Sequence, residues 1–133
     1  MLAGLFASLE PSRKLRGLTK QRLRVLGAKN RYRIADVCVM ALPYHSEPVL
    51  STPPHLIVEV RSPEDETADV LAKVADYLRF GVAHIWIVDP YKHTVQEADH
   101  DGIRSRDDLV LETDLVGRVD FNDLFAKVDE PTE

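Results

Sequence analysis

The chain has 133 residues, of which 44% are hydrophobic and 29% charged, and its formal net charge is -5. This length and composition fit one globular domain over residues 1–133 with a single core. No apolar run approaches the length of about 18 residues that a membrane span needs, and the lone Cys38 excludes an internal disulfide and a zinc site built from several thiolates.

The N-terminal segment is apolar and then basic. Apolar residues recur at helical spacing from Leu2 to Leu9, which predicts an amphipathic helix over residues 2–10 that Pro11 ends. A secretory signal has the reverse order of charge and hydrophobicity. We therefore expect a cytoplasmic protein that has no membrane partner.

A basic block follows this helix. Of the 17 basic residues, nine lie between Pro11 and Ala35, where no residue is acidic, which leaves eight basic against 22 acidic residues elsewhere. Such a block can mark a surface for a polyanion such as nucleic acid. Solvated positions on a helix end and an edge strand explain the same pattern, so charge alone does not decide. The block consists of Arg13, Lys14, Arg16, Lys20, Arg22, Arg24, Lys29, Arg31 and Arg33.

The stretch RLRVLGAKNRYRIADVCV predicts two antiparallel strands joined by a four-residue loop, Gly27–Asn30. Residues 43–54 contain four prolines and are expected to form a loop, after which residues 55–61 form a third strand. Alternation places Asp36 on one face with Tyr32, Ile34 and Cys38, with Arg33, Ala35, Val37 and Val39 on the other. In the third strand it places Leu56, Val58 and Val60 on one face, and His55, Ile57, Glu59 and Arg61 on the other.

The third strand leads into a helix. Ser62 and the proline and acids after it are typical of a helix start, and the helix is predicted to be established by Thr67 and to run to Phe80. Gly81 is the expected C-cap. The predicted buried stripe is Val70, Val74, Tyr77 and Leu78.

Residues 82–88 form the most apolar predicted strand, which Asp89 and Pro90 close. Weaker strands are expected at 94–98 and 109–112, with a turn at Asp101-Gly102, followed by a helix over 121–127 and a frayed tail over 128–133. The unit from 55 to 88 has the length of a right-handed crossover between parallel strands. The order αβββαβ therefore predicts an α/β fold in which helices flank a mixed sheet.

Asp36 and Glu59 are the candidates for chemistry. If their strands are neighbours, the two carboxylates converge, and a divalent cation or a cationic side chain must offset their repulsion. Magnesium suits such a pair, because waters and a substrate phosphate can complete its coordination. Lys73, one helix later, can orient or help to deprotonate an attacking water and offset charge in the transition state.

Structural roles explain the same residues. Asp36 can be a residue of a turn at the strand end, and Glu59 can form an ion pair with Arg61 or Lys73. The five histidines have no paired metal-binding spacing, and Cys38 in mid-strand is more typical of packing than of a nucleophile.

Three blocks of the sequence resemble one known family. They are RYRIADVCV, PPHLIVEVRSPED, and Lys73 with DYLRFGVAHIWIVDP. In order and spacing they are similar to the Uma-two family of bacterial restriction endonuclease-like proteins, in the PD-(D/E)xK nuclease superfamily. The resemblance covers roughly residues 20–125. It implies an αβββαβ core and metal-dependent hydrolysis of phosphodiester bonds in DNA, with double-stranded DNA favoured.

The resemblance also implies roles for residues. Asp36 and Glu59 take the places of the two metal-binding carboxylates, for Mg²⁺ or alternatively Mn²⁺. Lys73 matches the lysine beside the water, while Arg61 stands where the E-x-K lysine would be and is expected to hold a phosphate. Ala35 replaces the proline of the PD element. Related nucleases also lead us to expect a homodimer.

Three hypotheses stand at this point. The first is a magnesium-dependent endonuclease. The second is a catalytically impaired nucleic-acid-binding or assembly module of the same fold, suggested by the basic block and by an N-terminus shorter than that of the relatives. The third is a structural protein in which Glu59 and Lys73 form an ion pair only.

Overall fold

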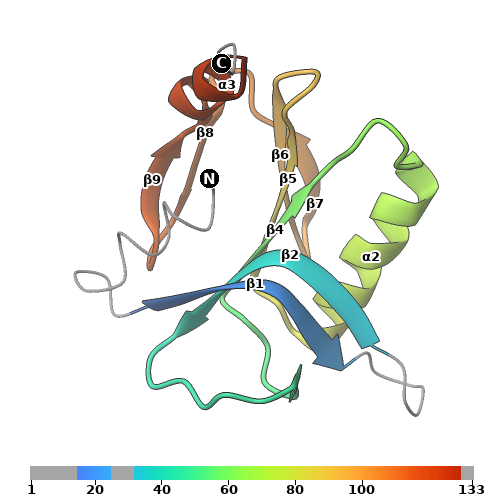
Figure 1. Cartoon of the computed structure of the whole chain (residues 1–133), viewed down its shortest axis with the longest axis vertical. Coiled ribbons are helices and arrows are strands. Elements are labelled where there is room, and N and C mark those ends of the chain that lie inside the picture. The colour runs from blue at the N-terminus through green and yellow to red at the C-terminus, as the bar shows by residue number, and fades with distance from the viewer. Residues whose placement is uncertain (1–14, 25–31, 130–133) are drawn as a thin grey trace, which may run out of the picture.

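The computed structural model describes residues 15–24 and 32–129, so the predicted helix over 2–10 and the loop at Gly27–Asn30 lie outside the described part. The described residues form nine strands and two helices (Figure 1). In chain order these are β1 Leu15–Arg24, β2 Tyr32–Ala41, β3 Val49–Leu50, β4 Leu56–Val60, α2 Thr67–Phe80, β5 His84–Asp89, β6 Thr94–Asp99, β7 Gly102–Ser105, β8 Val110–Thr113, β9 Gly117–Asp120 and α3 Phe121–Asp129.

Seven strands form one mixed sheet in the order β3-β1-β2-β4-β5-β6-β7, and β8 pairs with β9 in a separate hairpin. The β1–β2 and β2–β4 pairs are antiparallel, whereas β4 and β5, which α2 connects, are parallel. Strands covered on both faces need nearly continuous apolar side chains. This explains why β4 and β5, buried from Leu56 to Glu59 and from Ile85 to Asp89, occupy the middle of the sheet. The predicted mixed α/β architecture is confirmed.

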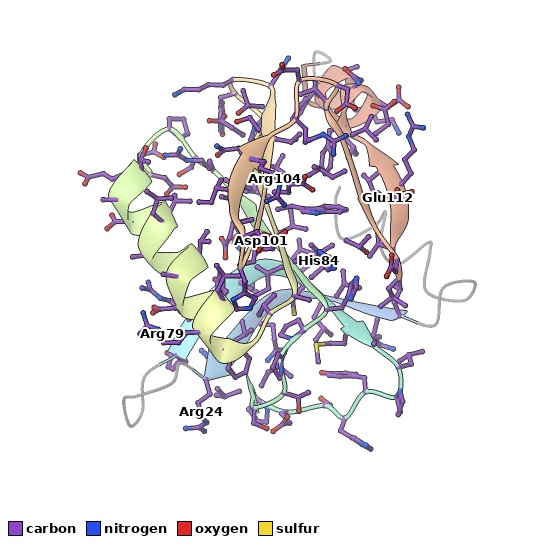
Figure 2. The ribbon with its side chains drawn as sticks, turned by 180° about the vertical axis from the view of Figure 1, so that it is seen from behind. Arg24, Arg79, His84, Asp101, Arg104 and Glu112 are labelled. Carbon is purple, nitrogen blue, oxygen red and sulfur yellow. The ribbon has the colours of Figure 1, made fainter. Side chains whose placement is uncertain are left out.

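Two different layers cover the sheet. Helix α2 lies along one face, and the β8–β9 hairpin with α3 lies on the other (Figure 1). Figure 2, seen from behind, shows Arg79 of α2 and Glu112 of β8 on opposite sides of the central strands. Alternate residues of β4 and β5 supply the two cores. Ile57 and Ile85 pack with α2, and Val58 and Trp86 pack with the β8–β9 hairpin and α3.

Helix α2 has the predicted bounds, Thr67 to Phe80, but its N-cap differs from the prediction. It begins at Thr67, but its N-cap is Glu66, which makes no side-chain capping bond. Ser62 belongs instead to a preceding turn, in which its amide donates a hydrogen bond of 2.9 Å to Asp65 Oδ2. Gly81 ends the helix with φ of 108°, a left-handed conformation that favours glycine, so the predicted C-cap is confirmed.

The alternation predicted for β2 is partly wrong. Ala35 packs in the same core as Cys38, whereas Val37 and Val39 belong to the core on the other face. The phase changes between Ala35 and Val37, beside Lys20 of β1, whose φ of 49° is positive. A local irregularity in the strand pair therefore shifts which side chains face α2.

Short strands account for most of the missed elements. β3 has two residues within the proline-rich loop, and all four residues of β7 are exposed, so neither shows an apolar alternation. β9 was also missed, and α3 extends to Asp129, two residues beyond its predicted end, while 130–133 lie outside the described part. No helix among the described residues is long and apolar enough to cross a membrane.

Candidate active site

The pairing of β2 with β4 brings Asp36 and Glu59 together. Val37 lies opposite Val58 in the ladder, which leaves Asp36 and Glu59 next along the two strands. At this point the backbone amide of Val60 donates a hydrogen bond of 2.8 Å to Asp36 Oδ2. The two carboxyl groups are close enough that each affects the pKa of the other. The predicted convergence is therefore present.

Glu59 is held inside the protein by two side chains of α2. Only 5% of its surface is exposed. The Tyr77 hydroxyl donates a hydrogen bond of 2.5 Å to Glu59 Oε1, and Lys73 Nζ lies 3.6 Å from Oε2. Burial raises the pKa of Glu59 to about 7, the negative charge of Asp36 adds to the rise, and the hydrogen bond from Tyr77 opposes it.

Lys73 reaches Glu59 because of its place on α2. Lys73 and Tyr77 are four residues apart and therefore lie on one face of the helix, directly above the sheet. The Lys73 side chain is about one-third exposed, at 35%, so its ammonium contacts both the carboxylate and solvent. This is the position that the sequence predicted for the third member of the site.

The sequence did not single out Lys20, which the structure places in this group. Lys20 Nζ lies 2.8 Å from Asp36 Oδ1. Burial acts to raise the pKa of Asp36, but hydrogen bonds from Lys20 and from the Val60 amide outweigh it and hold the pKa below its ordinary value. The two carboxylates are thus flanked by two lysines, one from β1 and one from α2.

Arg61 points along the start of α2. Its Nη2 donates to the backbone oxygen of Asp65 at 3.2 Å and to Thr67 Oγ1 at 3.4 Å. Its Nε is buried and has no hydrogen-bond partner in the described part. Of the two ion pairs considered for Glu59, the described residues form the one with Lys73.

Two adjoining cavities lie beside this group. A cavity of about 50 Å³ is lined by Glu59, Lys73 and Asp69, together with Arg61 and Asp65. The latter two residues also line a cavity of about 240 Å³. Both cavities lie just past the carboxyl ends of the parallel strands β4 and β5, where ligands of α/β proteins bind. The larger cavity is completed by Ser62, Pro63, Asp89, Tyr91 and Lys92.

A still larger cavity, of about 400 Å³, lies at the opposite ends of these strands. It is lined by the proline-rich loop and by residues such as Met40, Tyr44 and His55. None of the four predicted site residues lines it. Its size therefore gives no reason to move the candidate site away from Asp36 and Glu59.

The carboxylate pair fits magnesium better than it fits a metal held entirely by protein. Among the described residues, no group of three or more His, Cys, Asp or Glu side chains is arranged to hold a metal ion. Mg²⁺ needs only one or two carboxylates, because it keeps several waters and accepts substrate phosphate oxygens. Asp36 and Glu59 meet that requirement.

Cys38 packs in the core on the α2 side of the sheet. Its side chain is fully buried, and burial raises the pKa of the thiol to about 12. A thiol in that state is a poor nucleophile, so Cys38 contributes to the core beneath the site.

Comparisons with known proteins identify the family and the fold. The model of the Uma2 family, described as "Putative restriction endonuclease", matches residues 2–108. A crystal structure of "a putative nuclease belonging to DUF820" from Anabaena variabilis ATCC 29413 superimposes with a TM-score of 0.78 at 17% identity, over 94% of this chain and 76% of that one. At that identity the likeness shows a common fold. A search of curated proteins finds no match.

Proposed function

This chain belongs to the Uma2 family of restriction endonuclease-like proteins, and from that premise we propose that it is a magnesium-dependent endonuclease that hydrolyses phosphodiester bonds in DNA. One observation carries the proposal. Two carboxylates from neighbouring strands, Asp36 and Glu59, meet beside an ammonium group, Lys73 Nζ, that lies 3.6 Å from Glu59. The nuclease-like fold supports the reaction class, and the residues support the mechanism.

Asp36 and Glu59 would hold the metal ion. Once bound, Mg²⁺ would neutralise charge on the phosphate and lower the pKa of a coordinated water. Tyr77 holds the Glu59 carboxyl group in place through its hydrogen bond to Oε1. Burial costs the charged form of Glu59 free energy, and a divalent cation would offset this cost.

Lys73 and Arg61 would act on the water and the phosphate. Lys73 lies beside Glu59 and is partly exposed, so its ammonium can orient the attacking water and stabilise negative charge in the transition state. Arg61 lines both cavities, so its guanidinium group can contact a phosphate oxygen there. Hydrolysis then joins the water oxygen to phosphorus, breaks the bond to one sugar oxygen and transfers a proton to that leaving oxygen.

Exposed basic residues of β1 support a nucleic acid as the substrate. Arg16, Arg22 and Arg24 are exposed on the strand that also carries Lys20. Such residues can neutralise backbone phosphates in any sequence. A homodimer and a cytoplasmic location stay predictions from the family and the sequence.

A plasmid-nicking assay tests the proposal. We expect nicking that requires Mg²⁺, and a loss of about 100-fold or more in Glu59→Ala and in Lys73→Ala. Glu112→Ala and Lys127→Ala make the same chemical changes on exposed residues of β8 and α3, and should leave the rate unchanged. Equal nicking by all five proteins would assign the activity to a contaminant.

A binding module without catalysis is the second candidate function. It is favoured by the lysines beside the carboxylates, because Lys20 and Lys73 already compensate their charge. This function predicts salt-sensitive DNA binding that needs no metal. Reversing Arg16, Arg22 and Arg24 to Glu should then abolish binding, and unchanged binding would exclude β1 as the contact surface.

A further inference from the structure

Lys20 occupies a position beside Asp36 that a metal ion would also use. Its ammonium lies 2.8 Å from Asp36 Oδ1, while Asp36 Oδ2 is already bonded to the Val60 amide. Asp36 is about three-quarters buried, with 23% of its side chain exposed. A cation that binds Asp36 Oδ1 would therefore meet the positive charge of Lys20.

The backbone of β1 is irregular at this residue. Thr19 pairs with Val37 and Gln21 pairs with Ala35, but Lys20 does not pair with Asp36 in the ladder. Lys20 instead has φ of 49°, a left-handed conformation that is uncommon for residues other than glycine. Such conformations persist where surrounding structure enforces them, and they are frequent at functional sites.

Each carboxyl group of this site lies beside one ammonium group without a metal. Asp36 and Glu59 supply two carboxyl groups, and Lys20 and Lys73 supply two ammonium groups. The lysines differ in freedom, because Lys20 is 74% exposed and Lys73 is 35% exposed. Exposed ion pairs contribute little to stability, and a lysine ammonium moves on a flexible stem. Lys20 can therefore leave Asp36 at low cost.

We propose that Lys20 is an internal competitor of the divalent cation at Asp36. Lys20 occupies Asp36 in the metal-free protein, and metal binding must displace it. The inference rests on the proposed metal site and adds a residue that sets its affinity. This chain binds Mg²⁺ more weakly than its two carboxylates alone would, and loading depends on the cation concentration.

Calorimetric titration of the full metal-free chain with Mg²⁺, and separately with Mn²⁺, tests the competition. Lys20→Gln removes the ammonium, and we expect both metals to bind about tenfold more tightly than in the wild type. Lys20→Arg keeps the charge and should retain weak binding. Lys127→Gln removes one exposed ammonium group from α3, on the other face of the sheet, and should also behave as the wild type.

A fourth variant guards against a fold defect. Lys20→Gly removes the ammonium and tolerates the positive φ, so it should gain affinity as Lys20→Gln does. In both variants the melting temperature should rise more on adding Mg²⁺ than it does in the wild type. This measurement does not depend on nuclease activity.

The outcomes separate this inference from the proposed function. If the wild type binds metal and Lys20→Gln and Lys20→Gly bind it no more tightly, competition is wrong and the metal site stands. If only the two variants without the ammonium bind metal, competition is right and the wild-type chain is not a magnesium enzyme. If no form binds metal, both ideas fail.

Discussion

The two faces of the central sheet bury different chemistry. Towards α2, the sheet buries Glu59 and the helix buries Asp76, with exposures of 5% and 7%. Towards β8–β9 and α3, the core is built from Trp86, Phe121 and Phe125 with aliphatic side chains. The sheet therefore carries two layers. The charged layer, with Glu59 and Asp76, lies towards α2, and the apolar layer lies towards β8–β9 and α3.

The charged layer costs stability, and the apolar layer offsets that cost. A buried carboxylate is unfavourable unless it is paired, and even a good pair seldom adds net stability. Burial of large apolar side chains supplies the main favourable term in folding. The face that holds Glu59 is thus the one on which we expect function, and the other face should determine whether the chain folds.

The largest effect should follow a change in the apolar layer. Phe121 is fully buried and packs edge-on against Trp86, with ring centroids 5.9 Å apart. Phe121→Ala should lower the free energy of unfolding by about 3–5 kcal/mol, because it removes contacts and leaves a cavity. Urea unfolding measures the loss. The folded variant should still gain stability from Mg²⁺, and its failure to do so would show that the two layers are coupled.

The next effect concerns pH and the charged layer. The pKa of Glu59 is about 7 in the folded protein, against an ordinary value of 4.5. The folded state therefore binds this proton more tightly than the unfolded state does. The resulting gain in the free energy of unfolding is complete below pH 4.5 and is lost as the pH rises through about 7. The loss should be about 3 kcal/mol in metal-free protein. Urea unfolding in EDTA from about pH 4.5 to about 8 measures it.

Glu59→Gln isolates this contribution, since glutamine does not titrate. The stability difference between wild type and Glu59→Gln should change with pH in the metal-free proteins. Glu112→Gln, on an exposed residue of β8, should follow the wild type. Saturating Mg²⁺ should remove the fall in wild-type stability, because the metal binds the ionised carboxylate. Parallel curves for wild type and Glu59→Gln would contradict the raised pKa.

A smaller effect is expected from the second buried carboxylate. Arg33 Nε donates to Asp76 Oδ2 at 2.8 Å, and Arg79 lies 4.0 Å from the other oxygen. Arg33→Gln should cost about 2 kcal/mol, less than the loss of a fully buried partner, because Arg33 is partly exposed. Asp76→Asn in the same protein should recover part of the cost. Strictly additive single changes in urea unfolding would show that the two residues are not coupled.

The spacing of apolar residues predicted the helices and strands that bury one face or both faces. The α2 stripe and the apolar runs of β4 and β5 have this signal, and they lie where the sequence placed them. β3, with two residues, and β7, which is exposed throughout, have no such signal. Their strand conformation comes from pairing with β1 and β6, which a single sequence does not reveal.

The meeting of Asp36, Glu59 and Lys73 was expected from the sequence, whereas the contact with Lys20 was not. Asp36 and Glu59 meet because β2 pairs with β4, and Lys73 reaches Glu59 from α2, the helix that follows β4. Lys20 meets Asp36 because of the β1–β2 register and the positive φ at Lys20. The sequence sets neither uniquely, so Lys20 was only one member of a basic block.

The smallest expected effect comes from Tyr77→Phe, which removes one hydroxyl from the charged layer. The Tyr77 hydrogen bond lowers the pKa of Glu59, so its loss should raise that pKa further. The free energy of unfolding should fall by about 1 kcal/mol. Carbon-13 NMR of the Glu59 carboxyl group measures the titration, and urea unfolding measures the stability.

Tyr91→Phe is the matched control, because Tyr91 is 67% exposed and lies on the turn after β5. It should change neither quantity. If Tyr77→Phe also leaves the Glu59 titration unchanged, then burial and the charges of Asp36 and Lys73 set that pKa. The α2 layer would in that case hold Glu59 by enclosing it, and orientation by the phenol would have no part in the site.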